Sequence, residues 1–469
     1  MSTGHDAIEN VRGASYGGVM SASEAIAALR RSFAGRMLLP DDAGFDAARA
    51  PWNLSIDQHP ALVANPRGVD DLRALLVAAR ETGMPLAVQP GGHGAGSDVT
   101  GAILVRMADF DMLDIDMAAG IAVVGAGVRW GRVIEALEGS GWVAPAGSSP
   151  VVTVAGYTLG GGHSLFSRTA GLGSDNLRAA WVLRTDGRHE RVDDGSDPDL
   201  MWALRGAGGV VGIVTALEID LVPAPAVWGA TLVFDVADAE AVLRGVRDLA
   251  PIAPPTLNAS VTSTRMPDAP QLPEAIRGKS FVTVQLISTA GPADDLLERL
   301  RSVAPVQREA VGETSPVTIA AQSGEPTEPT PSRGASAALA SLDDDTIDAL
   351  LSFHRHDDQW PVIGIEFRML GGALATPRRA GFAGLESAGW LVYALAPLFP
   401  GAPVQPGDAS LARFREIVAP ASAERTVPTF LTPGQTLAGA ATGEALARLR
   451  AVRERADPDG LLHHGRLPR

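Results

Sequence analysis

The first half of the chain alternates short apolar runs with stretches in which apolar residues recur at helical spacing. In "DDLRALLVAARETG", Leu72, Leu75, Leu76 and Ala79 fall on one face and Gly83 follows, which predicts a helix that ends at this glycine. Three apolar runs predict buried strands, namely "LAVQ", "GAILVRM" and "IAVVGAGV", and "WGRVIEALEGSG" predicts another amphipathic helix. Strands that alternate with helices indicate an α/β domain.

The pattern changes after a proline-rich stretch at residues 222–227, which we interpret as a hinge. Longer strands follow, in "WGATLVFDV", "SFVTVQLIST", "VIGIEFRML" and "WLVYALAPLF", and helical stretches near 237–249, 293–303 and 407–418 separate some of them. This order predicts an antiparallel sheet with helices on one face. The segment "SGEPTEPTPSRGAS", residues 323–336, is expected to be a surface loop.

Composition and charge narrow the class of protein. At 469 residues the chain is long enough for two domains. A formal net charge of −15 argues against a nucleic-acid partner, and the absence of cysteine excludes disulfides and thiolate metal sites. His354 and His356 have the spacing of a metal pair, but we expect them in a solvated loop and predict no metal site. No signal peptide or membrane-spanning apolar run is visible, so we expect a cytoplasmic protein without a membrane partner.

Several loops are unusually rich in glycine: "LAVQPGGHGAG", "PAGSSPVVTVAGYTLGGGHS", "GLGSDNL" and "RGAGGVVGIVT". Glycine leaves backbone N–H groups uncovered, which suits close approach of a diphosphate. A Rossmann fingerprint is an alternative interpretation of "VVGAGVRWG", residues 123–131. Its third glycine comes one place late, and no acidic residue follows about 20 residues on to hold a ribose, so we do not favour it.

The order of these motifs resembles a known family. "WNLSIDQHPALVANP", "VQPGGHGAG", "PAGSSPVVTVAGYTLGGG", "GLGSDN", "DLMWALRGAGGVVGIVT" and "RLRAVRERADPDGLL" together are similar to the FAD-linked oxidases of the vanillyl-alcohol oxidase superfamily, berberine bridge enzyme-like branch, actinobacterial type. The resemblance implies an α+β fold, in which a PCMH-type FAD-binding domain of two α/β subdomains carries an inserted substrate domain with an antiparallel sheet and helices. The limits that we expect are an N-terminal arm at 1–35, the FAD-binding domain at 36–224, the substrate domain at 225–425 and a C-terminal segment at 426–469 that completes the FAD-binding domain.

The resemblance also implies the residues that bind FAD. His93, in the "GGH" loop, corresponds to the histidine that bonds covalently to the C8-methyl group of the isoalloxazine ring. Many relatives attach the flavin a second time through a cysteine, where this chain has Ser149. Serine cannot form the thioether, so any covalent link is expected through His93 alone. The full set of cofactor-binding residues implied is Gln89, Pro90, Gly91, Gly92, His93, Gly94, Ala95, Gly147, Ser148, Ser149, Val152, Thr153, Val154, Gly156, Tyr157, Gly160, Gly161, Gly162, His163, Asp175, Asn176, Gly212, Ile213 and Val214.

The catalytic groups depart from the family pattern. Relatives often carry a tyrosine that serves as general base and an asparagine in a "YLNF"-like stretch, whereas Val427 and Thr429 stand at those places in "VPTF". Neither can act as a base with a useful pKa. Glu366 and Arg368 share one strand face in "GIEFRML", with Tyr393 on the next strand, and these three are the candidate catalytic residues.

The function expected from this resemblance is an FAD-dependent oxidase that takes a hydride from a small organic substrate, with O₂ as the electron acceptor, and we expect a secondary-metabolite intermediate as the substrate. A redox-neutral cyclase or dehydratase that uses the flavin pocket as a scaffold is the alternative, because the tyrosine is lost at Val427 and the loop "LGGGHS" is changed. A protein without enzymatic activity, either flavin-binding or free of FAD, is a third interpretation.

Overall fold

The computed structural model describes residues 21–96, 98–270, 272, 274, 276–356, 362–398 and 405–468. Most of the predicted N-terminal arm lies outside this range. The described part of the arm begins with the helix α2 (Ala22–Ser32), whose N-terminus is closed by a reciprocal capping box between Ser21 and Glu24. Within the described residues, no helix has both the length and the apolar character needed to cross a membrane.

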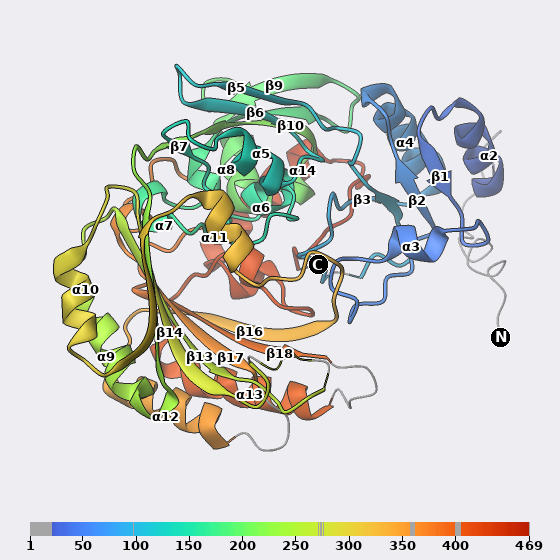
Figure 1. Ribbon diagram of the computed structural model, residues 1–469. Helices are drawn as coiled ribbons and strands as arrows, with labels where there is room; N and C mark the ends of the chain where they lie inside the picture. The colour runs from blue at the N-terminus through green and yellow to red at the C-terminus, as the bar shows by residue number, and fades with distance from the viewer. Residues whose placement is uncertain are drawn as a thin grey trace.

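A small four-stranded sheet forms the first part of the structure, on the right of Figure 1. Its strands lie in the order β1-β2-β4-β3, with β2, β4 and β3 parallel. The predicted helix is confirmed as α4, and Gly83 ends it in the left-handed conformation that glycine adopts without strain. The elements are β1 (Arg36–Leu38), α3 (Phe45–Arg49), β2 (Leu62–Asn65), α4 (Val69–Thr82), β3 (Leu86–Val88) and β4 (Ile103–Val105).

A five-stranded sheet follows, in the order β5-β6-β10-β8-β9. All its pairs are antiparallel, so only the first sheet has the parallel arrangement that alternating strands and helices suggest. The elements are β5 (Leu113–Asp116), β6 (Ile121–Gly125), α5 (Trp130–Ala136), β7 (Trp142–Val143), α6 (Val154–Leu159), α7 (Ser167–Ala170), β8 (Leu177–Leu183), β9 (His189–Asp193), α8 (Pro198–Ala207), β10 (Ile213–Asp220), β11 (Val222–Pro223), and, at the far end of the chain, α14 (Gly443–Ala456).

The glycines of the Rossmann-like stretch have a packing role. A side chain at Gly125 would place its Cβ 2.2 Å from the carbonyl oxygen of Phe110, and one at Gly127 would lie 2.2 Å from that of Met107. No real Cβ approaches a backbone oxygen so closely, so these positions need glycine because the backbone of the connection between β4 and β5 lies directly against them. A nucleotide is not required to explain them.

The second half of the chain forms a seven-stranded sheet in the order β15-β12-β14-β13-β17-β18-β16, and every pair in it is antiparallel as predicted. Helices α9, α10, α12 and α13 cover one face, while the other face looks toward the first half of the chain (Figure 1). The elements are β12 (Trp228–Asp235), α9 (Ala239–Leu249), β13 (Leu257–Arg265), β14 (Ser280–Ser288), α10 (Asp294–Arg301), β15 (Val306–Glu313), α11 (Pro316–Gln322), β16 (Ser332–Leu339), α12 (Asp344–His356), β17 (Gly364–Met369), β18 (Trp390–Pro397) and α13 (Gln405–Val418).

Two details of this half differ from the sequence prediction. The predicted loop 323–336 ends earlier, because residues from Ser332 onward pair with β18 as strand β16. His354 does not lie in a solvated loop: it is buried on α12, with Nε2 2.9 Å from the Val362 carbonyl oxygen and Nδ1 2.9 Å from the Ser263 hydroxyl. The side chain of His356 is outside the description. Both ring nitrogens of His354 therefore have structural partners.

Two large apolar cores match the two halves. One gathers residues from Ile26 to Leu221 together with Phe382 and residues 431–467, so the C-terminal segment packs into the first half. The other gathers residues between Trp228 and Val418. The residue limits of the domains, as given above, stay a prediction.

Arg168, at α7, joins the two halves. Its buried guanidinium donates to the carbonyl oxygens of Leu257 at 2.7 Å and Ala253 at 3.0 Å, and also to that of Leu370. Burial lowers the pKa of Arg168, and no acidic side chain among the described residues forms an ion pair with it. The positive charge is instead stabilised by backbone dipoles of the second half.

We predict that Arg168→Met lowers the free energy of unfolding by about 3 kcal/mol, because three or more buried carbonyl groups lose their donor. Thermal unfolding followed by circular dichroism measures the loss. Arg188→Met is the matched control, because Arg188 is exposed and pairs only with Asp186; its unfolding temperature should stay within about a degree of wild type. Equal stability of the two variants would contradict the bridging role.

Candidate functional site

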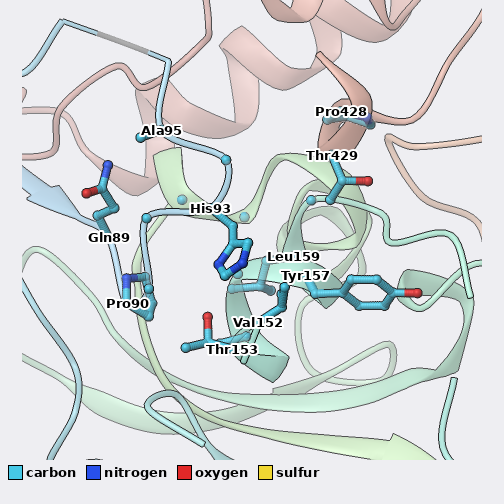
Figure 2. Close-up of a pocket in the computed structure, with 18 of the residues that line it drawn as sticks. Gln89, Pro90, His93, Ala95, Val152, Thr153, Tyr157, Leu159, Pro428 and Thr429 are labelled. Atoms are coloured by element: carbon cyan, nitrogen blue, oxygen red, sulfur yellow. The ribbon is translucent and has the colours of Figure 1, made fainter. Parts of the chain in front are cut away.

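A cavity of about 520 Å³ lies where the two halves of the chain meet the C-terminal segment. The loop after β3 forms one side and residues of α6 form the floor (Figure 2). Further walls come from the glycine-rich loop 206–212, from residues 428–430, and from the C-terminal residues 463–466. Arg368 of the large sheet contributes from the opposite half.

Arg106 fixes the loop that carries His93. Its buried guanidinium donates to the Gln89 side chain at 2.7 Å, and to the backbone oxygens of Gln89 at 3.1 Å and Ala50 at 2.9 Å. Burial lowers the pKa of Arg106 to about 10, which leaves it charged at neutral pH. The next turn needs a positive φ, which Gly92 supplies at +78°. The loop is therefore held at its start and turned sharply just before His93.

His93 projects into the cavity from this loop (Figure 2). Its ring stacks on Trp52, with centroids 4.2 Å apart and planes inclined by 14°. Burial lowers the pKa of His93 to about 4, and the positive charge of Arg129 contributes further. The imidazole is thus neutral at neutral pH. Its Nδ1 is buried and has no hydrogen-bond partner among the described residues.

The floor of the cavity holds other polar atoms without partners. The hydroxyl groups of Ser149, Tyr157 and Thr429 are buried, and none has a hydrogen-bond partner within the described part of the chain. Burial raises the pKa of Tyr157 far above its ordinary value, so this phenol keeps its proton. Buried polar groups in native proteins normally have partners. The unpaired atoms therefore indicate a polar ligand in this cavity.

Most of the predicted FAD residues line this cavity: Gln89, Pro90, Gly91, Gly92, His93, Gly94, Ala95, Gly147, Ser148, Ser149, Val152, Thr153, Gly156, Tyr157, Gly160, His163, Gly212 and Val214. The backbone in these loops is accessible because so many positions are glycine. Together with the unpaired polar atoms, this lining fits a large cofactor with a diphosphate.

Six predicted residues do not line the cavity, namely Val154, Gly161, Gly162, Asp175, Asn176 and Ile213. Val154 and Ile213 are fully buried in the first core. A Cβ at Gly162 would lie 2.3 Å from the Tyr157 ring, and one at Gly161 would lie 2.6 Å from Val427, so both glycines allow close packing. These four residues therefore pack behind the residues that line the cavity and support them.

Asp175 and Asn176 stabilise the turn that precedes β8. The Asp175 carboxylate accepts from the Leu172 backbone N–H at 2.8 Å, and the Asn176 amide donates to the carbonyl oxygens of Leu172 and Ala170 at 2.8 and 3.0 Å. Burial raises the pKa of Asp175 to about 7. Their hydrogen bonds are directed to the protein backbone.

Arg368 forms the polar end of the cavity. It donates to the Glu366 carboxylate at 2.8 Å, and its other terminal nitrogen lies 3.4 Å from Nδ1 of His163. Burial lowers the pKa of His163 to about 3, with the charge of Arg368 as the second cause, so His163 is neutral. Since arginine can only donate, Nδ1 of His163 accepts and its proton is on Nε2. Arg368 is thereby held from two sides.

Glu366 and Tyr393 stand directly opposite each other on β17 and β18, as the sequence suggested. Neither lines the cavity, although both adjoin Arg368. Burial, with the charge of Glu366 in addition, raises the pKa of Tyr393 to about 12. The structure thus groups the three candidate catalytic residues, and Arg368 is the one among them that faces the cavity.

The C-terminal stretch "VPTF" carries no proton acceptor. Val427 is fully buried against the glycine loop, and the Thr429 backbone N–H donates to the Gly160 carbonyl oxygen at 3.1 Å. This stretch closes the cavity and holds the loop in place.

Several lining residues were not identified from the sequence: Trp130, the stretch 206–210, Glu325, Phe430, His463 and Arg466. The glycines at 206, 208 and 209 belong to the glycine-rich stretch "RGAGGVVGIVT", so they could have been identified from the sequence. The sequence around Glu325 and Arg466 contains no comparable pattern that indicates a cavity residue. Arg466 donates to the carbonyl oxygens of Thr432 at 2.8 Å and Gly94 at 3.1 Å, so it ties the chain end to the His93 loop.

Comparison with known proteins identifies the ligand class. Residues 60–193 match the FAD binding domain family. (R)-6-hydroxynicotine oxidase of Paenarthrobacter nicotinovorans is 32% identical over 196 residues, which is 41% of this chain and 43% of that protein. The chain thus matches less than half of the length of such curated relatives.

Solved structures agree over nearly the whole chain. The BBE-like 1 protein of Physcomitrella patens superposes with a TM-score of 0.79 at 20% identity, over 96% of this chain and 99% of that one. Glucooligosaccharide oxidase from Acremonium strictum, which is described with a 6-S-cysteinyl, 8α-N1-histidyl FAD, gives a TM-score of 0.78 at 19% identity, over 96% and 99%. At these identities the likeness establishes the fold. The chain therefore carries an FAD-binding domain and has the α+β fold of the berberine bridge enzyme-like flavoproteins, as predicted.

Proposed function

We propose that the protein is an FAD-dependent oxidoreductase of the oxidase type, which takes a hydride from a small organic substrate and uses O₂ as its electron acceptor. We place it among enzymes of secondary metabolism and expect the cofactor to be bound covalently through His93 alone. The observation that carries the proposal is a neutral imidazole with an unpaired Nδ1, projecting into a cavity built from the loops of an FAD-binding domain.

One group of the lining residues would hold the cofactor. FAD, when bound, supplies hydride acceptance and electron transfer to O₂. His93 would tether it, and the backbone of the glycine loops would accommodate its diphosphate. Ser149 stands where relatives have a cysteine, and its hydroxyl cannot form a thioether.

On the substrate side, we assign contact with the substrate to Arg368. Glu366 neutralises and orients this guanidinium through the 2.8 Å hydrogen bond, and Tyr393 packs beside the pair. With its pKa raised to about 12, Tyr393 keeps its proton at neutral pH and is a poor general base. Ser260 and Thr262 lie opposite Arg368 and Glu366 on β13, so the same sheet face continues with hydroxyl groups. Such a face suits a polar substrate.

A redox-neutral cyclase or dehydratase is the second candidate, and one observation favours it. Val427 replaces the tyrosine base and is fully buried. A reaction that leaves the flavin oxidised would need no base at that place.

We predict that acid precipitation leaves the yellow flavin attached to the wild-type protein and releases it from His93→Ala, because the proposed covalent bond is made by this imidazole. Absorbance of the supernatant and intact mass measure the attachment. His163→Ala is the control: His163 also lines the cavity, but it should retain the bound flavin. Complete release from wild type would refute the covalent assignment.

We further predict that His93→Ala combined with Ser149→Cys regains acid-stable flavin. The Ser149 hydroxyl is buried in the cavity wall without a partner in the described structure, at the place where relatives have a cysteine. Intact mass of the double variant gives the measurement. The neighbouring Ser148→Cys in the same background is the control and should stay flavin-free after acid. If both cysteine variants behave alike, the assignment of position 149 is wrong.

Anaerobic mixing with a substrate should bleach the flavin absorbance, and admission of air should restore it with release of one peroxide per turnover. A panel of alcohols, amines, sugars and polyketide-like compounds, followed by stopped-flow absorbance, provides the measurement. Turnover with the flavin band unchanged and no O₂ consumption would instead support the redox-neutral function.

A further inference from the structure

The segment 323–331, here called the strap, crosses from the second half of the chain to the first. It leaves α11 and leads into β16, and Figure 1 shows it running between the FAD-binding part and the large sheet. The Thr330 backbone N–H donates to the Trp52 carbonyl oxygen at 3.1 Å. Just beyond it, Ser332 and Asn53 exchange two hydrogen bonds, of 2.9 and 3.1 Å. The strap is thus tied to the residue that stacks on His93.

Glu325 is the strap residue that lines the cavity. Its carboxylate accepts a hydrogen bond from the Ser148 hydroxyl, next to Ser149 on the cavity wall. Glu325 is itself exposed, so it stands at the rim where the cavity meets solvent. Glu328, three residues along the same strap, is also exposed but does not line the cavity.

Among the described residues, three charged side chains line this cavity: Glu325, Arg368 and Arg466. His93 and His163 are neutral, with pKa values lowered by burial to about 4 and about 3. Arg368 is already balanced by Glu366, at 2.8 Å. Arg466 lies against the Gly94 carbonyl oxygen, in the loop that follows His93. Among the described residues that line the cavity, Glu325 is the one acid, and no described basic side chain forms an ion pair with it.

Glu325 and Arg368 line the same cavity, so the charge of the strap acts on its polar end. The negative charge of Glu325 contributes, after that of Glu366, to raising the pKa values of Arg368 and Tyr393. Glu325 therefore adjoins the polar end, where the substrate is proposed to bind. The protein as a whole, with a formal net charge of −15, also attracts cations.

The geometry points to Glu325 as the recognition group for a cationic substrate: a small organic molecule that bears a protonated amine, held at the cavity rim. This assignment rests on the proposed oxidase function and names its substrate class. The ammonium group serves for binding and is not the oxidised centre, because a protonated amine has no nitrogen lone pair to assist hydride loss from the adjacent carbon. The reacting C–H bond lies deeper, toward Arg368.

Binding to the oxidised flavoprotein tests this without turnover. Three probes share one skeleton and differ in charge: 2-phenylethylamine, 2-phenylethanol and phenylacetate. Titration of each against the flavin absorbance spectrum should give the lowest Kd for the protonated amine, and added NaCl should weaken that complex selectively. Glu325→Gln should raise the Kd of the amine about tenfold and leave that of the alcohol unchanged. Glu328→Gln is the matched control and should behave as wild type.

Three outcomes would overturn the assignment. One is tighter binding of phenylacetate or 2-phenylethanol than of the amine by wild type, and another is an unchanged preference for the amine in Glu325→Gln. Equal loss in Glu325→Gln and Glu328→Gln would also refute it, because a general field effect does not distinguish the two positions. Retention of flavin and an unchanged unfolding temperature show that each variant is folded. Since no step here uses O₂ or turnover, failure of the oxidase function would be seen separately, as absence of bleaching and peroxide.

Discussion

The buried guanidinium of Arg106 is the contact on which the site depends. It collects carbonyl oxygens from residues 48–50 and both oxygens of Gln89, so two distant segments share one cation. One segment leads directly into Trp52 and the other into His93, and the two rings then stack. An arginine can do this because its five N–H donors lie in one plane. The His93 imidazole is consequently fixed in place by contacts within the protein, which would lower the entropic cost of the proposed attachment to FAD.

The position of the polar residues on the large sheet follows from the alternation of side chains along each strand. Ile365, Phe367 and Met369 are buried toward the helices, which sends Glu366 and Arg368 to the opposite face. Because that face looks toward the FAD-binding half, Arg368 reaches the cavity directly from the sheet, without a dedicated loop. Burying one face with helices therefore determines which face can serve a substrate.

Periodicity and glycine content made much of this structure predictable. The helix α4, its end at Gly83 and the antiparallel seven-stranded sheet follow from local spacing, which the final fold preserves. The structural role of an individual glycine could not be predicted from the sequence. Gly162 borders the Tyr157 ring and Gly161 borders Val427, and both needs arise only when the chain folds back. His354 was misplaced for a similar reason, since its partners Ser263 and Val362 come from other elements.

Two of the residues that sequence reasoning missed, Glu325 and Arg466, reach the cavity through contacts over long separations in the chain. Glu325 meets Ser148 and Arg466 meets Gly94, and neither pair leaves a local pattern. The strap, residues 323–331, is rich in proline and threonine, and its sequence contains no apolar run that would predict packing against the protein. The sequence alone therefore predicts a solvated loop. In this fold the segment is nevertheless held by hydrogen bonds to its backbone at Thr330 and Ser332. The exposed carboxylate of Glu325 is therefore kept at one position beside the cavity.

Proton handling in the proposed reaction follows from these placements. Val427 has no ionisable group, His163 and His93 have strongly lowered pKa values, and the pKa of Tyr393 is raised to about 12. At neutral pH none of these side chains both lacks a proton and binds one strongly, which a general base requires. The carboxylates of Glu366 and Glu325 remain, one beside Arg368 on the sheet and one at the rim on the strap. In the proposed reaction, a general base would therefore come from the large sheet or the strap, whereas the resembled family has its tyrosine in the C-terminal stretch.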